Sequence, residues 1–321
     1  MDARRLIKAT LPAMARAALE PELPEWLQVR WYSGRDEAIA MAPGAEIGWL
    51  DLFDTTAKAK AIRLATDMRW LNSMVAGMDS FPLEELRRRQ IVVTNGKGIN
   101  AVTIAEYVVM GMLTIAKGYR AVVQAQQRHE WLKEAPGKVE LAGSRALLLG
   151  YGGIGQLVEP RLKAMGVDVT VVRRGRQNQP VAGILGSDQW RMRLNVFDWI
   201  ILALPSTAET RHMIGAVELA AMKPSAVLIN VARGDLVEQD ALVQALRQHT
   251  IAAAFLDVTD PEPLPCDHAL WELDNAHVTM HLSGRSQTRM VERAARRFLD
   301  NLSRYRAGEA MQYQVDLTRG Y

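Results

Sequence analysis

Apolar and polar positions alternate along the first hundred residues in short blocks. Apolar runs predict strands and helical spacing predicts helices, with strands at residues 27–31, 45–50, 69–75 and 91–94 and helices at 35–41 and 82–89. Pro82 suits the first turn of its helix, where no backbone donor is needed. Because strands and helices take turns, we expect a small parallel sheet covered by helices.

The pattern after residue 100 predicts a second and longer α/β unit. Apolar positions from Ile104 to Ile115 recur at helical spacing, in a long helix that we expect over residues 101–131. Beyond it, the pattern predicts strands at 145–149, 167–172, 199–204, 226–230, 251–255 and 277–279, helices at 154–165, 216–222, 239–248 and 286–305, and an extended tail at 313–321. Pro160 falls inside the helix at 154–165, so we expect a kink or a shortened first segment there.

The composition is that of an ordinary globular chain. With 321 residues, 49% of them hydrophobic and 23% charged, there is enough chain for two domains with separate cores. The net charge of +3 is small and gives no reason to expect a nucleic-acid partner. Cys266 is the single cysteine, which excludes an internal disulfide. No segment has the apolar length of a signal peptide or a membrane span, so we expect a cytoplasmic protein with no membrane partner.

The strand at 145–149 leads into the motif Gly150-Tyr-Gly152-Gly-Ile-Gly155, which opens a predicted helix. Three glycines at this spacing permit a tight turn, a close approach to a pyrophosphate and close helix–strand packing. Backbone N–H groups at the start of the helix then face the phosphates. A glycine-rich turn without a ligand is the alternative, but the flanking strand and helix favour a dinucleotide site that includes Gly153 and Ile154.

The next strand ends in Val171-Val-Arg-Arg-Gly-Arg176. An NAD-binding unit usually carries an acidic residue at this point, which holds the ribose hydroxyls. Arg173 and Arg174 would instead form charge-assisted hydrogen bonds with a 2′-phosphate. A solvated basic strand end is the alternative. We therefore expect NADP(H) as the preferred cofactor and NAD(H) as the other candidate.

Three further residues follow predicted strands and could carry chemistry. Arg233 offers a planar fork that can hold a carboxylate, and Glu262 lies in a rigid loop between two prolines. His281 is suited to proton transfer near neutral pH. Together with the hydride of a nicotinamide, these are the parts needed to reduce a 2-keto acid. His277 and His281 also suggest a metal site, but they lie far apart on a strand and we expect no metal.

These motifs, taken in order, resemble the D-2-hydroxyacid dehydrogenases. The resemblance covers nearly the whole chain and rests on the glycine motif, Asn230-Val-Ala-Arg-Gly234, Asp257 with Glu262-Pro-Leu-Pro265, His281, Ala76-Gly-Met-Asp79, Ile104-Ala-Glu106, Leu270-Trp271, and Val315-Asp with the closing Gly-Tyr321. It implies two Rossmann-like or flavodoxin-like domains with parallel sheets. The substrate domain would be discontinuous, at residues 1–99 and 286–321, with a dinucleotide-binding domain at 100–285.

The resemblance also implies roles for individual residues. Arg233 would anchor the substrate carboxylate and polarise the carbonyl, while His281 would be the acid/base and Glu262 its partner. Backbone N–H groups near Ala76 and Gly77 would hold the carboxylate as well. Further contacts to the cofactor are expected from Asp257, which would meet the nicotinamide amide, and from Thr103, Leu204, Pro205, Val231, Ala232 and Gly284. Such enzymes are usually homodimers joined through the cofactor domain.

The chain departs from the family pattern at two places, at Arg173, which occupies the position of the expected acidic ribose ligand, and at Met280. Met280 stands where the family commonly has proline before the catalytic histidine, which frees the backbone there but removes no catalytic atom. Leu52 and Phe53 are expected on the substrate side and hint at a substrate larger than glyoxylate.

The leading hypothesis is an NADP(H)-preferring 2-keto-acid reductase that forms the D-2-hydroxy acid, similar to the glyoxylate/hydroxypyruvate reductases. Two alternatives are a dehydrogenase of this fold acting on another small acid and a nucleotide-sensing, corepressor-like binding protein. For the first, the presence of Arg233, Glu262 and His281 together argues against formate. The second would need a surface for partner peptides.

Overall fold

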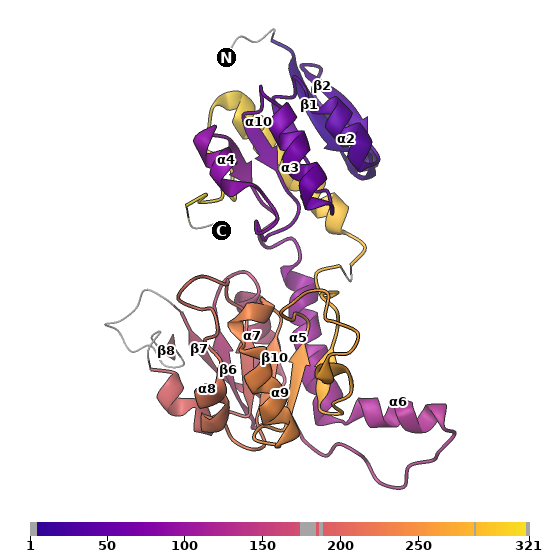
Figure 1. Cartoon of the computed structure of the whole chain (residues 1–321), viewed down its shortest axis with the longest axis vertical. Coiled ribbons are helices and arrows are strands. Elements are labelled where there is room, and N and C mark those ends of the chain that lie inside the picture. Colours follow the sequence, from indigo (N-terminus) through magenta and orange to yellow (C-terminus); the bar gives the residue numbers. More distant parts are fainter. Residues whose placement is uncertain (1–4, 174–183, 186–188, 286, 319–321) are drawn as a thin grey trace. The chain divides into compact units, whose positions relative to one another are not determined.

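The computed structural model describes residues 5–173, 184–185, 189–285 and 287–318. The chain divides into two compact units, Met1–Asn100 with Gln287–Tyr321 as the first and Ala101–Ser286 as the second (Figure 1). Each unit contains a sheet of parallel strands with helices packed against it. The predicted fold class, two α/β domains with parallel sheets, is confirmed.

The first unit has the strand order β2-β1-β3-β4-β5, which is the flavodoxin-like order. Its strands are β1 (Ile7–Pro12), β2 (Leu27–Tyr32), β3 (Ile47–Trp49), β4 (Trp70–Asn72) and β5 (Val92–Thr94), and its helices from this part of the chain are α1 (Arg16–Leu19), α2 (Arg35–Met41), α3 (Thr55–Leu64) and α4 (Leu83–Arg88). The strand β1 and the helix α3 were not predicted. Lys8 and Thr10 interrupt the apolar run of β1, and α3 begins with a polar stretch capped by Asp54, which accepts a hydrogen bond from the Ala57 N–H at 2.9 Å.

The last helix, α10 (Met290–Ala307), returns to the sheet of the first unit. Its Phe298 ring stacks on Trp70 with ring centroids 5.0 Å apart, and Tyr305 stacks on the same indole at 5.5 Å. Phe298 is fully buried. Burial of one large side chain of this kind stabilises a fold by about 1.5–3 kcal/mol, which explains why the C-terminal segment joins the N-terminal strands.

The second unit has the strand order β12-β11-β10-β9-β6-β7-β8. These strands are β6 (Arg145–Leu149), β7 (Asp168–Val172), β8 (Ile184–Leu185), β9 (Trp199–Leu202), β10 (Val227–Asn230), β11 (Ala253–Leu256) and β12 (Ala276–Val278). The strand order reverses between β6 and β9. In open parallel sheets, ligands bind beyond the carboxyl ends of the strands at such a point.

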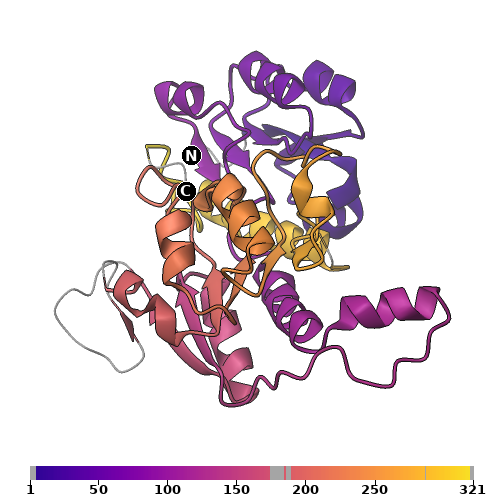
Figure 2. The ribbon, with the colours of Figure 1, turned by 60° about the horizontal axis from the view of Figure 1, so that its bottom comes forward.

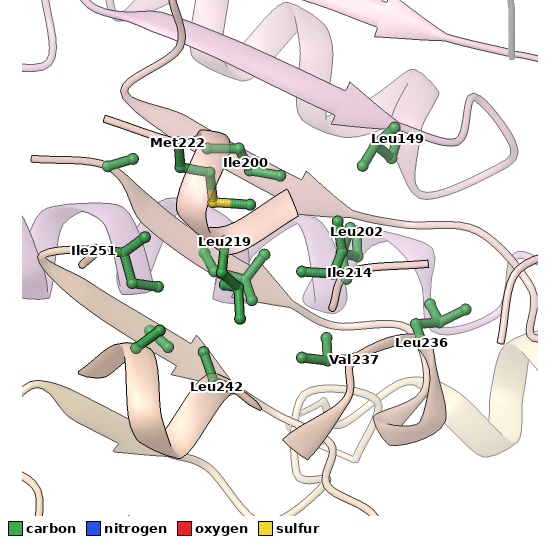
Figure 3. Close-up of a cluster of buried hydrophobic side chains, with 14 of the residues drawn as sticks. Leu149, Ile200, Leu202, Ile214, Leu219, Met222, Leu236, Val237, Leu242 and Ile251 are labelled. Carbon is green, nitrogen blue, oxygen red and sulfur yellow. The ribbon is translucent and has the colours of Figure 1, made fainter. Parts of the chain in front are cut away.

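Helices cover both faces of the second sheet. The helices α5 (Ala101–Ala116) and α7 (Gly155–Ala164) pack on one face, while α8 (Ala216–Ala221) and α9 (Gln239–Arg247) pack on the other. Figure 3 shows Leu149, Ile200 and Leu202 of the sheet in one buried cluster with Leu219 of α8 and Leu242 of α9. Short 3₁₀ helices occur at Ala13–Ala15, Glu20–Glu22, Arg191–Val196, Gly234–Leu236 and Ala269–Trp271.

The long helix expected over residues 101–131 is broken. It ends at Ala116, and a second helix, α6 (Tyr119–Gln127), begins after Gly118, whose φ is +60°. A Cβ at Gly118 would lie 2.8 Å from the backbone nitrogen of Gly137, so glycine permits both the turn and the close approach. Figures 1 and 2 show α6 extending away from the sheet of its own unit.

None of the described helices is long and apolar enough to cross a membrane by itself. The pair α5 and α6 meets the length and composition criteria only when both are counted together, and it is bent by 68°.

The helix α7 runs through Pro160 as a single element, so the shortened first segment that was expected as one possibility is wrong. Pro160 and Gln156 are both exposed. The carbonyl of Gln156, which loses its donor, can therefore bond to water instead. At the C-terminus, α10 begins at Met290 rather than near Ser286, which lies outside the described residues, and the tail forms an antiparallel bridge between Gln314 and Thr94.

Candidate active site

The glycine motif after β6 uses its three glycines in three ways. Gly150 has a φ of +104°, and a Cβ there would lie 2.4 Å from the Ala203 carbonyl oxygen. A Cβ at Gly155 would lie 2.3 Å from the Gly150 carbonyl oxygen, so this glycine lets α7 pack closely on the strand. At Gly152, a Cβ would meet no heavy atom within 4 Å in the part of the chain that is described. The loop is therefore tight on its inner side and open where a phosphate could approach.

Tyr151 lies within this glycine loop and links it to α7. Its hydroxyl donates a hydrogen bond to Glu159, which also accepts one from Lys163 Nζ at 2.7 Å. The bond to Glu159 raises the pKa of the Tyr151 phenol, whereas the positive charge of Arg173 lowers it. Arg173 is exposed at the end of β7, close enough to act on the loop electrostatically. Arg174 lies outside the described residues.

The strands β10, β11 and β12 end side by side, which brings their following loops together. Asn230 pairs with Leu256, and Leu256 pairs with Val278. Arg233, Glu262 and His281 follow these strand ends in the same order. All three predicted catalytic residues therefore belong to one edge of the second sheet.

The loop that carries Arg233 is held by its neighbours in the motif. The Asn230 side-chain amide donates to the Arg233 carbonyl at 2.7 Å and accepts from the Ala232 N–H at 3.1 Å. A Cβ at Gly234 would lie 2.0 Å from the carbonyl oxygen of Thr259, so only glycine allows the two loops to touch. Asn230 and Gly234 thus set the place of the half-buried Arg233 beside the Glu262 loop.

His281 and Glu262 form a hydrogen-bonded pair, with 2.8 Å between Nδ1 and the carboxylate. Burial raises the pKa of Glu262. The hydrogen bonds from His281 and from the Thr259 N–H, together with the charge of Arg233, lower the pKa by more than burial raises it, so the net shift is downward. The carboxylate is therefore ionised at neutral pH and can only accept, so Nδ1 of His281 carries the proton. Its Nε2 is left for a substrate.

Asp257 contacts the turn around His281 from within the core. Its side chain is buried, with 1% of the residue exposed, and accepts hydrogen bonds from the Thr279 hydroxyl at 2.7 Å, from the N–H groups of Leu282 and Ser283 at 3.0 and 3.2 Å, and from the Ser283 hydroxyl. The family resemblance implied a contact of Asp257 with the nicotinamide amide, which stays a prediction, and these hydrogen bonds were not predicted. Hydroxyl residues on both sides of a histidine could have indicated them.

In the first unit, the loop that carries Ala76 and Gly77 follows β4, with Ala76 exposed and Gly77 half-buried. Asp51 holds the start of this loop by accepting from the Met74 N–H at 2.7 Å and from the Ser73 hydroxyl at 2.6 Å. The Asn95 amide holds its far side through the Ala76 carbonyl at 2.7 Å. Within the described residues, no acceptor is bonded to the N–H of Ala76 or Gly77.

A close approach of Gly96 also fixes this loop, since a Cβ there would lie 1.9 Å from the Met74 carbonyl oxygen. Asp51 and Gly96 were missed by the sequence reasoning, although each is a polar or small residue just after a strand. Leu52 is half-buried, and Phe53 is 91% exposed after β3.

The remaining predicted cofactor residues lie in the second unit. Leu204 and Pro205 follow β9 beside the glycine loop, while Val231 and Ala232 are buried after β10, Gly284 follows the His281 turn, and Thr103 is buried near the start of α5. Across the described part of the chain, no group of three or more histidine, cysteine or acidic side chains is placed to hold a metal ion.

A parallel sheet with a glycine loop at its switch point defines the second unit as a dinucleotide-binding domain of an oxidoreductase. The family model of the D-isomer specific 2-hydroxyacid dehydrogenases, NAD binding domain, matches residues 109–283, all within this unit. The chain belongs to the D-isomer specific 2-hydroxyacid dehydrogenase family and is an NAD(P)-dependent oxidoreductase.

Individual relatives agree with the family assignment. The chain is 31% identical to glyoxylate/hydroxypyruvate reductase B of Pectobacterium atrosepticum, over 78% of this chain and 80% of that protein. A D-isomer specific 2-hydroxyacid dehydrogenase family protein from Aeromonas salmonicida has a similar structure, with a TM-score of 0.86, 27% identity, and coverage of 98% and 100% of the two chains.

A second solved structure of similar fold contains a cofactor. It is a D-isomer specific 2-hydroxyacid dehydrogenase from Xanthobacter autotrophicus in complex with NADPH and MES, with a TM-score of 0.77, 26% identity, and coverage of 99% and 100%. The chain spans about half the length of the D-3-phosphoglycerate dehydrogenases that it also matches, at 49% and 56% of two of them.

Proposed function

We propose that this protein is an NADP(H)-preferring reductase that converts a 2-keto acid to the D-2-hydroxy acid. The observation that carries the proposal is the shared sheet edge at which Arg233 follows β10 and the His281–Glu262 pair follows β11 and β12. A cation for a carboxylate and a proton donor held by an ionised acid are the two protein groups that this reaction requires.

Each residue has a defined task in the reduction. Arg233 holds the substrate carboxylate and polarises the carbonyl, while Nε2 of His281 donates a proton to the carbonyl oxygen. Glu262 accepts the hydrogen bond from Nδ1 throughout and stabilises the imidazolium before the proton leaves. The bound nicotinamide supplies the hydride that attacks the carbonyl carbon. We also propose that the N–H groups of Ala76 and Gly77 bind the carboxylate, and that Leu52 and Phe53 contact the substrate side chain.

The residues around the glycine loop fit a dinucleotide. The open side of Gly152 leaves room for a pyrophosphate at the start of α7. Exposed Arg173, with Arg174 beside it in the sequence, favours a 2′-phosphate over a free hydroxyl. The NADPH complex of the relative from Xanthobacter supports the same cofactor type.

The test is a steady-state screen of NADPH and NADH oxidation with glyoxylate, hydroxypyruvate, phenylpyruvate and branched 2-keto acids. We expect turnover with at least one acid, a rise in KM and a fall in kcat in R233A, and a shift of preference toward NADH in R173D/R174S. The matched control is R296S, which removes an exposed arginine of α10 whose side chain is 70% exposed. It should leave the cofactor preference unchanged.

Three outcomes would contradict parts of the proposal. If no 2-keto acid is turned over while NADPH binds, the corepressor-like alternative is favoured, and turnover of another small acid would favour a different dehydrogenase. An unchanged ratio of NADPH to NADH use in R173D/R174S would reject the phosphate-binding role of the two arginines.

We further propose that the active form is a homodimer joined through the second unit. An apolar groove of about 840 Å³ is lined by residues of α5, α6 and α7, among them Met110, Leu113, Tyr119 and Met165. Three of these side chains belong to residues that are 36–58% exposed, which is unusual for apolar groups that lie close together. A second copy of the chain, contributing the same surface, would bury them.

A further inference from the structure

The four residues Thr279, Met280, His281 and Leu282 form a tight β-turn. The Leu282 N–H donates to the Thr279 carbonyl at 3.1 Å, and the two central residues, Met280 and His281, have φ values of +53° and +55°. Two successive positive φ values are typical of a type I′ turn, which favours asparagine and glycine. Methionine and histidine are unfavourable at these positions. The surrounding structure must therefore hold the turn in this form.

Asp257 stabilises this turn through hydrogen bonds of both its side chain and its backbone. The carboxylate accepts from the Thr279 hydroxyl before the central residues and from the Leu282 N–H after them, at 2.7 and 3.0 Å. The Asp257 carbonyl accepts from the His281 N–H itself at 2.5 Å. Ser283 adds its N–H and hydroxyl to the same carboxylate. Of the turn residues, only Met280 has no contact with Asp257 among these bonds, and it is 60% exposed.

The backbone of Asp257 is itself fixed by the neighbouring strands. Its N–H donates to the Asn230 carbonyl at 2.9 Å, and the Thr279 N–H donates to the Leu256 carbonyl at 2.9 Å. Asn230 also holds the Arg233 loop through its side chain. One continuous set of hydrogen bonds therefore connects the Arg233 loop with the turn that carries His281.

We propose that Asp257 is a positioning residue that locks Met280 and His281 in the left-handed conformation. The lock keeps the His281 imidazole in contact with Glu262 and fixes the direction of Nε2. Proline has a φ near −65° and cannot enter this turn at position 280, so the turn explains why proline does not stand there. The role of His281 as proton donor rests on the proposed function. The conformation of the turn and its bonds to Asp257 are independent of that function.

The first test exchanges residue 280 and does not touch Asp257. M280P should lower kcat by about a hundredfold, because the turn cannot form and a mispositioned acid loses most of its contribution. M280G should keep the kcat of the wild type, since glycine adopts a positive φ without strain. Circular dichroism and thermal unfolding of both variants show whether the rest of the chain is folded.

A structural readout accompanies the kinetics. The proton on His281 Nδ1, bonded to Glu262, is expected as a downfield NMR resonance that disappears in H281Q. This resonance should be lost in M280P and kept in M280G. If M280P retains both the resonance and the wild-type kcat, the proposal is overturned.

The second test changes the lock itself. D257N replaces an acceptor oxygen by a donor, and S283A removes the hydroxyl that the carboxylate accepts. Both should weaken the downfield resonance, speed amide hydrogen exchange at Leu282 and lower kcat. A large loss of NADPH affinity in D257N with the resonance intact would instead make Asp257 a cofactor contact and reject the positioning role.

The two proposals fail in different ways. If the wild type reduces no 2-keto acid, the proposed function is rejected, while the resonance and the hydrogen exchange still decide whether Asp257 locks the turn.

Discussion

Glu262 and His281 are hydrogen-bonded at 2.8 Å, and this contact influences the pH at which Glu262 ionises. The pKa of Glu262 is lowered in the folded state, with His281 as the strongest of the groups that lower it and burial acting against them. A carboxylate with a lowered pKa stabilises the fold above the pKa of the unfolded state, and this contribution is lost as pH falls through the folded value. Glu262 thus remains ionised below its ordinary value of 4.5.

Replacement of Glu262 by glutamine tests this pair. E262Q removes the charge that stabilises the imidazolium, so kcat should fall by about ten- to a hundredfold. In the wild type, the loss of kcat/KM that protonation of Glu262 causes should occur at a lower pH than the ordinary pKa of a glutamate would give. We would measure kcat/KM against pH for the wild type, for E262Q and for the control E140Q, which changes an exposed glutamate. Equal kcat in E262Q and the wild type would contradict the role of the pair.

Sequence motifs identified Arg233, Glu262 and His281 because each follows an apolar strand in a distinctive local pattern. The groups that hold them were harder to find, since their contacts join positions distant in the sequence. Asp257 bonds to residues more than twenty positions later, and Gly234 meets the backbone of Thr259. Met280 adopts a positive φ that proline cannot adopt, but the hydrogen bonds that hold this turn join residues distant in the sequence and could not be predicted from the local pattern.

At the level of elements, the junction of β6 with α7 shows how one short motif serves both the fold and the ligand. Gly150 and Gly155 lie so close to backbone oxygens that a Cβ has no room, whereas Gly152 faces open space. Gly150 and Gly155 are therefore required by the fold, whereas we expect Gly152 to be required for the approach of the cofactor. This difference can be measured.

Alanine substitutions at the three glycines should have different effects. G150A and G155A should each lower the free energy of unfolding by about 1–3 kcal/mol, because the added methyl meets a carbonyl oxygen. G152A should change stability by less than about 0.5 kcal/mol and instead weaken NADPH binding. Chemical denaturation and NADPH titration distinguish the two effects. Strong destabilisation by G152A with normal NADPH affinity would show that the glycine serves only the fold.

Most elements of the second unit could be predicted because its buried strands are continuous apolar runs. The failures have physical causes. Polar residues interrupt the apolar pattern of β1, and the helix break at Gly118 depends on a contact with Gly137 that the local pattern cannot reveal. The helix α7 can continue through Pro160 because the carbonyl of the exposed Gln156, which loses its donor, is open to water.

For the whole molecule, the proposed dimer makes the apolar groove between α5, α6 and α7 a buried interface. A charge among its apolar lining residues should prevent association, because a carboxylate loses its water there without gaining a partner. L113E should therefore sediment as a monomer when the wild type sediments as a dimer. The matched control is V217E, which places the same charge on α8 at a residue that is 78% exposed. Dimerisation of L113E with wild-type strength would place the interface elsewhere.

The return of the C-terminal helix to the first unit could be anticipated only through the family resemblance. Nothing in the local pattern of α10 selects one sheet over the other. The choice is made by stacked rings, because Trp49 and Trp70 present flat indoles on which Phe298 packs. Tertiary packing of this kind couples residues more than two hundred positions apart.

That arrangement has a consequence for the order in which the protein is made. The residues Ala101–Ser286 form one uninterrupted segment and can complete their sheet while the chain is still being synthesised. The five strands of the first unit are also complete by Thr94, but its core is not, because Trp70 stacks on Phe298 of α10, which is synthesised much later. Until then, the apolar surface that α10 covers stays exposed to solvent, and exposed apolar surface of this kind favours aggregation of a nascent chain.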